Sequence, residues 1–498
     1  MSYYMIGIGG TGAKCLEAFI HLCGAGLLKD SQPVKIVYVD ADVSCGNLQR
    51  TQKAADLYAK AQKIGFGDTG ILKNAITTCA PWTPVPENCV NIDDVFQRTS
   101  LVNKEKYKDL GMLYDALFTE QERVTPLDNG FRGHPAIGAA VMSQAMIAEQ
   151  SEQWKELEQQ INTDKDARVF LFASVFGGTG AAGFPTIAKI LKNNLKKDEN
   201  GKPLTKIGGA LILPYFQFPS APNEEEQQMQ AKVADFMLNT KSALDYYDKS
   251  GLLGDVFNNI YLVGDNDLTE MKEFSLGSNS QKNDAHFIEL YAALAAFDFF
   301  NKTDFSEVTT PMIARGDEDD LDTTDKVTWD DIPNVCLDGN VKDKLAAYIR
   351  FLYAYKNCIL INLAKCAASE TEKRNVTWYK DLVEKAGKID VYHDREIMDA
   401  FNALGDYADS FFDWWRQIIL ANDKRYIELL NKQLWESGLW EKTRLDIYQV
   451  VLPIKERKEK LTYQAFWKAL CNHTGKLKTI NAGGSEILMR AVYEICKN

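Results

Sequence analysis

One stretch of the chain, 169–183 with the sequence VFLFASVFGGTGAAG, restricts the possible folds more than any other. Its first seven residues form an apolar run of strand length without alternating polar side chains, which indicates a strand buried on both faces. Glycines follow at once, and Pro185 stands just inside the helical sequence TIAKILKNNLKK. The stretch therefore predicts a strand, a tight glycine turn and the N-terminus of a helix.

Such a junction forms an anion site, because backbone N–H groups point outward there and the helix dipole favours negative charge. Glycines let the backbone approach a phosphate closely. Glycines at a strand–helix junction can also serve packing alone. The candidate phosphate-binding residues are Gly177, Gly178, Thr179, Gly180 and Ala181.

A second turn of the same kind lies at the start of the chain. Strands are expected over Tyr3–Ile8 and Val34–Val39, with an amphipathic helix over Cys15–Ala25 between them. The turn before this helix contains Gly9, Gly10, Thr11 and Gly12, and the second strand ends in two acids, Asp40 and Asp42.

This beginning fits the pattern G-x-G-x-x-G with an acid at the end of the second strand, which on its own suggests a dinucleotide fold. A nicotinamide-linked oxidoreductase is therefore one reading, although it leaves the turn at 177–183 unexplained. The P-loop pattern G-x-x-x-x-G-K-[ST] is absent, because Cys15 follows Lys14.

Two more buried strands, Ile207–Leu213 and Asn259–Val263, alternate with helices expected over 139–161, 224–247 and 285–300. This alternation predicts an α/β fold: an open, mainly parallel sheet with helices on both faces. Ligands of such sheets bind beyond the carboxyl ends of the strands, where all of these turns lie.

The chain divides into three parts by composition. We expect a nucleotide-binding domain over 1–310, in which 48–130 is an elaborated insertion. An acidic linker follows over 311–340, and a mainly helical domain, with one possible short strand at Val450–Ile454, covers 341–498.

Composition excludes several classes of function. The net charge of −12 over 498 residues argues against free nucleic acid as a partner. The ten cysteines show neither C-x-x-C nor zinc spacing, and no leader precedes the first strand, so we expect a cytoplasmic protein. The most apolar stretch, Leu345–Ala368, contains Arg350 and Lys356 and predicts a buried helix instead of a membrane span.

The turns together resemble those of the tubulin superfamily of GTPases, which includes the bacterial division protein FtsZ, and are most similar to the prokaryotic tubulin-like proteins. Residues 176–183, FGGTGAAG, resemble its G-G-G-T-G-[ST]-G loop, with Phe176 in place of the first glycine. Residues 9–12 and 40–42 stand where its first two loops stand. The sequence HPAIG at 134–138 resembles N-P-x-x-G of the third loop, which places Pro135 and Gly138 near the γ-phosphate.

This resemblance implies GTP or GDP with Mg²⁺ as cofactors and Asp42 in the metal shell. Asn283 and Asp284 open a segment, 283–302, that is similar to the family's central helix and following loop, where an Asn or Asp reads guanine. A carboxylate there accepts from guanine N1–H and the N2 amine together. Asn266, just after the strand 259–263, is a further candidate at the nucleotide.

Residues 301–307, NKTDFSE, resemble the family's N-x-D-x-x-D loop with one extra residue. In the family this loop enters the nucleotide pocket of the next subunit, so the resemblance implies head-to-tail assembly into filaments, with Asp304 and Glu307 as catalytic acids. A solvated turn is an equally good reading of the local sequence. Pro219 replaces the carboxylate expected at the ribose.

Two alternatives remain open beside a polymerising GTPase. One is a GTP-binding subunit that does not polymerise and binds a protein partner through its helical C-terminal domain. The other is the nicotinamide-linked oxidoreductase described above.

Overall fold

The computed structural model describes residues 2–128, 130–131, 133–147, 152–217, 233–265, 268–270, 281–305, 326–420, 426–436, 446–453, 459–473 and 484–497. Two of the candidate site residues, Asn266 and Glu307, lie outside them, as do residues 311–325 of the expected linker. None of the helices within these ranges is long and apolar enough to cross a membrane.

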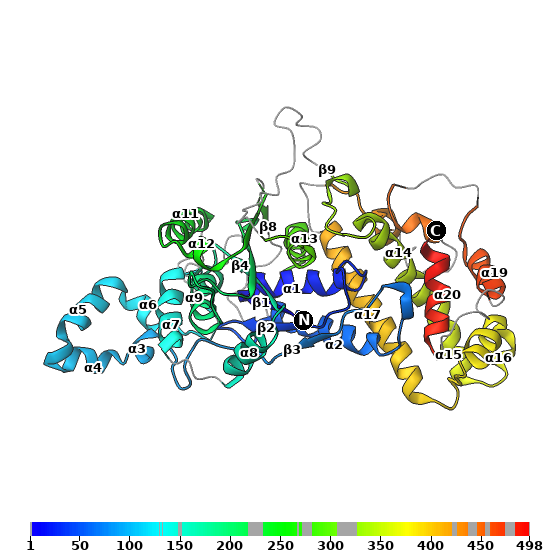
Figure 1. The fold of residues 1–498 in the computed structure, drawn as a ribbon, viewed down its shortest axis with the longest axis horizontal. Coiled ribbons are helices and arrows are strands. Elements are labelled where there is room, and N and C mark those ends of the chain that lie inside the picture. The colour runs from blue at the N-terminus through cyan, green and yellow to red at the C-terminus, as the bar shows by residue number, and fades with distance from the viewer. Residues whose placement is uncertain are drawn as a thin grey trace.

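A six-stranded parallel sheet forms the centre of the molecule (Figure 1). Its strands lie in the order β3, β2, β1, β4, β5, β7, so β1 is flanked by β2 and β4, and Tyr3 pairs with both Val34 and Arg168. The strands are β1 (Tyr3–Ile8), β2 (Val34–Val39), β3 (Ile76–Thr78), β4 (Arg168–Ser174), β5 (Lys206–Ile212) and β7 (Asn259–Val263). The predicted parallel sheet is confirmed.

Helices cover both faces of the sheet, as predicted, because alternate strand residues are apolar on both sides. One face packs against α1 (Gly9–Cys23), α2 (Gly46–Gln62) and α13 (Phe287–Asn301). The other face packs against α7 (Pro135–Ile147), α8 (Glu152–Thr163), α9 (Gly178–Asn194), α11 (Val233–Lys249) and α12 (Leu252–Val256). Within 139–161, expected as one helix, the described residues are helical: they belong to α7 up to Ile147 and to α8 from Glu152 onward.

The segment 48–130 has two structural roles. Most of α2 and all of β3 lie within it and belong to the central β-α-β layer. Residues 90–124 of the segment contain four short α-helices that project from one end of the molecule (Figure 1): α3 (Ile92–Val95), α4 (Arg98–Asn103), α5 (Lys108–Leu117) and α6 (Glu120–Val124). We call this projection, 90–124, the arm.

The C-terminal region is mainly helical, as predicted, and lies at the end opposite the arm (Figure 1). Its helices are α14 (Val341–Ala354), α15 (Ile361–Ala368), α16 (Glu372–Asn375), α17 (Arg395–Leu420), α18 (Lys432–Glu436), α19 (Tyr463–His473) and α20 (Glu486–Lys497), with π-helical turns at Tyr355–Leu360 and Tyr379–Ala386. The possible short strand at Val450–Ile454 is not formed over its described part, 450–453: Ile447–Val450 is a 3-10 turn, and Val451 forms only a single bridge with Leu430.

The C-terminal helices share one hydrophobic core with the sheet layer. Side chains of α14 and α17 belong to the same buried cluster as those of α1, α2 and α13. The expected linker also contributes, because Val327, Trp329 and Val335 are buried in this cluster. Movement of the C-terminal helices would therefore disturb the helices beside the first glycine turn.

His21 of α1 lies in this shared core. Its ring packs against Tyr407, Phe411 and Trp414 of α17, and neither ring nitrogen has a hydrogen-bond partner among the described residues. Burial, with a smaller effect of the Arg50 charge, lowers the pKa of His21 to about 3. The folded chain therefore keeps this imidazole neutral at any ordinary pH.

As the pH falls from 6 to 4.5, we expect protonation of His21 in the unfolded chain to reduce the free energy of unfolding by about 2 kcal/mol. The lowered pKa means that its contribution is complete above pH 6.5, the pKa of an unfolded histidine, and is lost as pH falls, because only the unfolded chain gains the proton. Urea unfolding at a series of pH values should show a flatter profile for His21→Leu. Parallel profiles for the two proteins would contradict this assignment.

Candidate nucleotide site

The two glycine turns lie side by side, because β1 and β4 are neighbours at the place where the strand order reverses. Gly9 has a φ of +74°, which favours glycine. A Cβ atom on Gly9 would lie 3.3 Å from the Thr179 Cβ and 3.4 Å from the Gly180 nitrogen. The reversal point of an open α/β sheet is where such folds bind their ligands.

Each turn leads directly into a long helix whose N-terminus has no side-chain cap. Helix α1 follows Ile8 and α9 follows Gly177; neither residue provides a capping hydrogen bond, and neither helix has an acid in its first turn. The first N–H groups of a helix have no partner within it. Two adjacent, uncapped helix ends therefore present a concentrated set of donors to an anion.

A third turn, the one expected near a γ-phosphate, packs on the second. A Cβ atom on Gly138 would lie 2.8 Å from both the Ala182 Cβ and the Gly178 oxygen. Pro135 is the first residue of α7 and is half-buried. Asn239 of α11 donates its side-chain amide to the oxygens of Gly133, at 3.2 Å, and Phe176, at 3.5 Å. All three turns thus meet at one edge of the sheet.

The remaining residues of the glycine turns also lie at this edge. Gly10 and Thr11 are half-buried in the first turn of α1, while Gly12 is buried against the Phe172 oxygen. Ala181 is buried in α9, and its oxygen accepts a 2.6 Å hydrogen bond from the Tyr247 hydroxyl. This bond holds the first turn of α9 against α11.

Two buried carboxyl groups, those of Asp40 and Asp42, stand beside the glycine turns. Asp40 Oδ1 accepts from the Asp42 nitrogen at 3.2 Å and, at 3.5 Å, from the Thr179 hydroxyl. Burial raises the pKa of Asp40 to about 7. The negative charge of Asp42 also raises this pKa, whereas the two hydrogen bonds lower it. Asp42 Oδ1 accepts from the nitrogen and hydroxyl of Ser44. Two such carboxylates with a hydroxyl are the hard oxygen donors that Mg²⁺ prefers.

Asn283 and Asp284 lie in an irregular segment before α13, so the expectation that they open this helix is wrong. The helix starts at Phe287 because His286 caps it: His286 Nδ1 accepts from the Ile288 nitrogen, and Glu289 accepts from the His286 nitrogen at 2.9 Å. A capping box of this kind fixes where a helix begins.

Three side chains hold this segment in place. The Asn283 nitrogen donates to Asn47 Oδ1 at 3.0 Å, and the Asn283 oxygen accepts from Arg50 Nη1 at 2.8 Å. The Ala285 nitrogen donates to Gln417 of α17 at 2.9 Å. Arg50 is itself fixed by an ion pair with Glu17, at 2.7 Å. The backbone of the segment is thereby fixed by α2 and by the C-terminal region.

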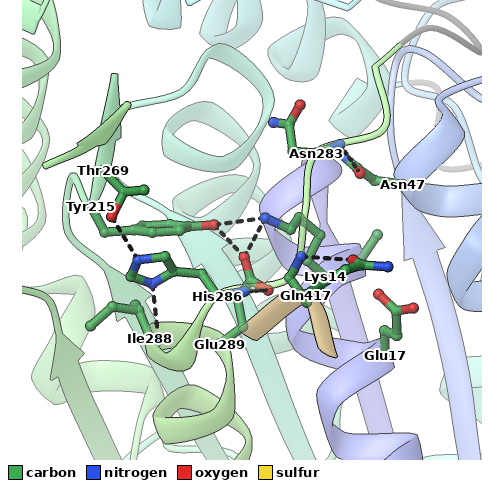
Figure 2. Close-up of polar contacts among 12 residues, drawn as sticks. Lys14, Glu17, Asn47, Tyr215, Thr269, Asn283, His286, Ile288, Glu289 and Gln417 are labelled. Carbon is green, nitrogen blue, oxygen red and sulfur yellow. Dashed lines mark hydrogen bonds and ion pairs between the residues drawn. The ribbon is translucent and has the colours of Figure 1, made fainter. Parts of the chain in front are cut away.

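Lys14 does not point toward the phosphate edge. Its ammonium group lies 2.5 Å from a carboxylate oxygen of Glu289, which is fully buried, and this oxygen also accepts a 2.6 Å hydrogen bond from Tyr215 (Figure 2). Thr269 contacts His286 Nε2 at 3.0 Å in the same network. Because Lys14 is neutralised inside the protein, it cannot act as the phosphate-binding lysine of a P-loop.

Asp304 lies at the opposite edge of the sheet. The C-terminal end of α13 is held there by Arg168, the first residue of β4, which donates to the oxygens of Phe300 and Lys302 at 2.7 Å and stacks on Phe305. Seven strand residues at about 3.3 Å each separate this edge from the glycine turns by roughly 23 Å. Asp304 is exposed and cannot reach the glycine turns of its own molecule.

Sequence reasoning missed the residues that support the site: Asn47, Arg50, Asn239 and Gln417. These polar side chains come from helices whose sequences carry no recognisable motif, and they become neighbours of the site only through packing. Only the position of Asn47, five residues after Asp42, provides a local clue.

No protein-family model matches the chain, and no curated protein matches it in sequence. Among solved structures, 48 chains match. One of them is CetZ2 from Haloferax volcanii, as a GTPγS-bound protofilament, which is 16% identical and superimposes with a TM-score of 0.29. The alignment covers 60% of this chain, and this chain spans 58% of the CetZ2 chain.

Proposed function

We propose that the chain is a tubulin-like protein that binds GTP or GDP with Mg²⁺, assembles head to tail and hydrolyses GTP at the junction between subunits. The observation that carries this proposal is the contact between the turns at Gly9 and Thr179, each opening an uncapped helix. A single glycine turn is enough to bind the phosphates of a dinucleotide. Two adjacent turns are better suited to binding the longer phosphate chain of a nucleoside triphosphate. Asp40 and Asp42 lie beside the two glycine turns.

In this proposal Asp42 belongs to the metal shell, and Asp40 supports it from the buried side. Mg²⁺ supplies neutralisation of phosphate charge when it is bound with the nucleotide. Backbone N–H groups of α1 and α9 bind the phosphate oxygens and stabilise the charge that develops as the γ-phosphate bond breaks. Asp40 is buried and accepts a hydrogen bond from the Thr179 hydroxyl. This position disfavours the contact with a ribose that a nicotinamide dinucleotide would need.

Guanine recognition is assigned to Asn283 and Asp284, whose backbone is held by Asn47, Arg50 and Gln417. We expect Asp284→Ala to weaken GTP binding by about 1–3 kcal/mol, because guanine donors are left unpaired, and to leave the weak binding of ATP unchanged. Calorimetry with both nucleotides measures this, and Lys282→Ala is the matched control. Equal affinities of the unmodified protein for ATP and GTP would refute guanine recognition.

Hydrolysis is assigned to the junction because Asp304 stands at the edge opposite the glycine turns. Water attacks the γ-phosphorus, the bond to the β–γ bridging oxygen breaks, and GDP and phosphate leave. Asp304 of one copy would orient this water at the nucleotide of the next copy and accept its proton, with Glu307 proposed beside it. General-base assistance of this kind accelerates reactions by about 10²–10⁴-fold.

Two results follow for turnover. GTPase activity per subunit should rise with protein concentration, and Asp304→Ala should bind GTP normally while hydrolysing it at least about 100-fold more slowly. Phosphate release over a dilution series measures both, with Asp330→Ala as a control for an exposed acid elsewhere. Activity that is independent of concentration and insensitive to Asp304→Ala would leave a GTP-binding subunit that does not polymerise.

A further inference from the structure

The arm carries an apolar surface that nothing in the described chain covers. Within 90–124, seven large apolar side chains are exposed: Val90, Val102, Leu110, Met112, Leu113, Leu117 and Val124. Three of them, Leu110, Leu113 and Leu117, are 53%, 56% and 63% exposed and follow the i, i+3, i+7 spacing of one helix face. Such a stripe on a projecting helix is typical of an interaction surface.

The arm is a built element, because its other face is packed. Tyr114 is buried between Phe96 and Phe118 and donates a 2.8 Å hydrogen bond to Asp93. Gly111 lets α4 pass close, with the Leu101 backbone 3.4 Å from the position of a Cβ atom. The inner face of α5 thus has its own small core, and the leucine stripe is left over on the outer face.

Charge along the arm is unequal at its two ends. The tip, before and at the start of α5, carries three exposed lysines, Lys104, Lys106 and Lys108, with two acids. The base carries five acids, Asp93, Asp94, Asp115, Glu120 and Glu122, with two arginines. The arm as a whole is therefore slightly acidic, which disfavours an anionic membrane or a nucleic acid as its partner.

We propose that the arm pairs with the arm of a second copy of this chain, in an antiparallel arrangement about a two-fold axis near Leu113. This arrangement covers both leucine stripes and places the lysine-rich tip of each arm against the acidic base of the other. Antiparallel α5 helices also align their dipoles favourably. A two-fold contact of this kind is self-complementary and closes, so it joins two copies without forming an open chain.

The contact between the two arms buries too little surface area to be strong. The three leucines of the stripe offer roughly 300 Å² per copy, or about 600 Å² in total, which is less than the 1,200–2,000 Å² of stable complexes. We therefore expect a reversible dimer at high protein concentration. This inference does not depend on the proposed GTPase, because the arm contains none of the candidate nucleotide-binding residues.

Sedimentation velocity of the full chain without added nucleotide tests the apolar part. The unmodified protein should dimerise over a series reaching several hundred micromolar, and Leu113→Asp should weaken the dimer at least about tenfold. Leu204→Asp, at a leucine that is 55% exposed outside the arm, should have no effect. Circular dichroism and thermal unfolding confirm that each variant is folded. A monomer throughout the series, or unchanged dimerisation of Leu113→Asp, would overturn the proposal.

Charge reversal tests the antiparallel arrangement. Lys104→Glu with Lys106→Glu makes the tip acidic, and Glu120→Lys makes the base less acidic while leaving the Thr119–Glu122 cap of α6 intact. Each variant alone should dimerise more weakly than the unmodified protein, because the acidic tip is repelled by the acidic base and the Glu120→Lys base attracts the lysine-rich tip less. The acidic-tip variant should pair better with the Glu120→Lys variant than with the unmodified protein, because a less acidic base then faces its tip. Absence of this preference would contradict antiparallel pairing, as would binding of the arm to lipid vesicles by a monomeric chain.

Discussion

Replacing Lys14 by methionine should lower the free energy of unfolding by about 3–5 kcal/mol, because it leaves the Glu289 carboxylate buried without its cation. The two groups are only 2.5 Å apart, both are almost completely inaccessible to solvent, and Tyr215 donates to the same carboxylate. Chemical denaturation of the purified variant measures the loss. A change below 1 kcal/mol would show that the pair is not buried as described.

Two controls separate the buried pair from lysine substitution in general. Lys14→Met combined with Glu289→Gln should regain most of the stability, because glutamine is uncharged and still accepts from the backbone nitrogen of His286. Lys192→Met breaks a 2.7 Å ion pair with Asp255 on the surface and should cost less than about 1 kcal/mol. The double variant is the sharper control, since it alters the same place in the core.

Gly10→Val should reduce the affinity for GTP at least about 100-fold, because a branched side chain beside the first N–H groups of α1 prevents close approach of a phosphate. The chain itself has room for a Cβ atom at this position, which would meet only Asn47 Nδ2, at 3.6 Å, and Cys45 Sγ, at 3.7 Å. Calorimetric titration of the folded variant with GTP measures this loss. Because the variant is folded, the lost affinity would reflect blocked binding of the ligand and not a disturbed fold.

The same experiment at Gly180 would be less informative. A Cβ atom there would lie 2.5 Å from the Ser174 oxygen and 2.8 Å from its nitrogen, so the substitution would displace α9 itself. Gly254→Val is the appropriate control for Gly10→Val, since nothing lies within 4 Å of its added Cβ atom and the residue belongs to α12, which contains no candidate site residue. Its affinity for GTP should equal that of the unmodified protein.

The parallel sheet and the edge at which its turns meet could be predicted because the information is local. A buried strand followed by glycines and a helix has a distinctive sequence, and it occurs both at 3–23 and at 168–194. Parallel connections then bring the carboxyl ends of the strands to one edge. The position of Asp40 and Asp42 beside the glycines follows from the same rule.

The start of α13 and the supporting residues could not be predicted, because they depend on partners far away in the sequence. The apolar sequence from 285 onward is compatible with a helix beginning earlier, but Glu289 accepts from the His286 backbone. Through Lys14 and Tyr215, Glu289 is also tied to α1 and to the connection that follows β5. Gln417 reaches the Ala285 backbone across 132 positions. Such contacts appear only when the helices pack.

The titration of nucleotide-free protein with GDP, ADP and NAD⁺ in the presence of Mg²⁺ tests the central claim most directly. The account predicts one site per chain that binds GDP at least about 100-fold more tightly than ADP or NAD⁺, and a loss of this binding in Gly10→Val but not in Gly254→Val. Tighter binding of NAD⁺ than of GDP, or an unchanged GDP affinity in folded Gly10→Val, would contradict it.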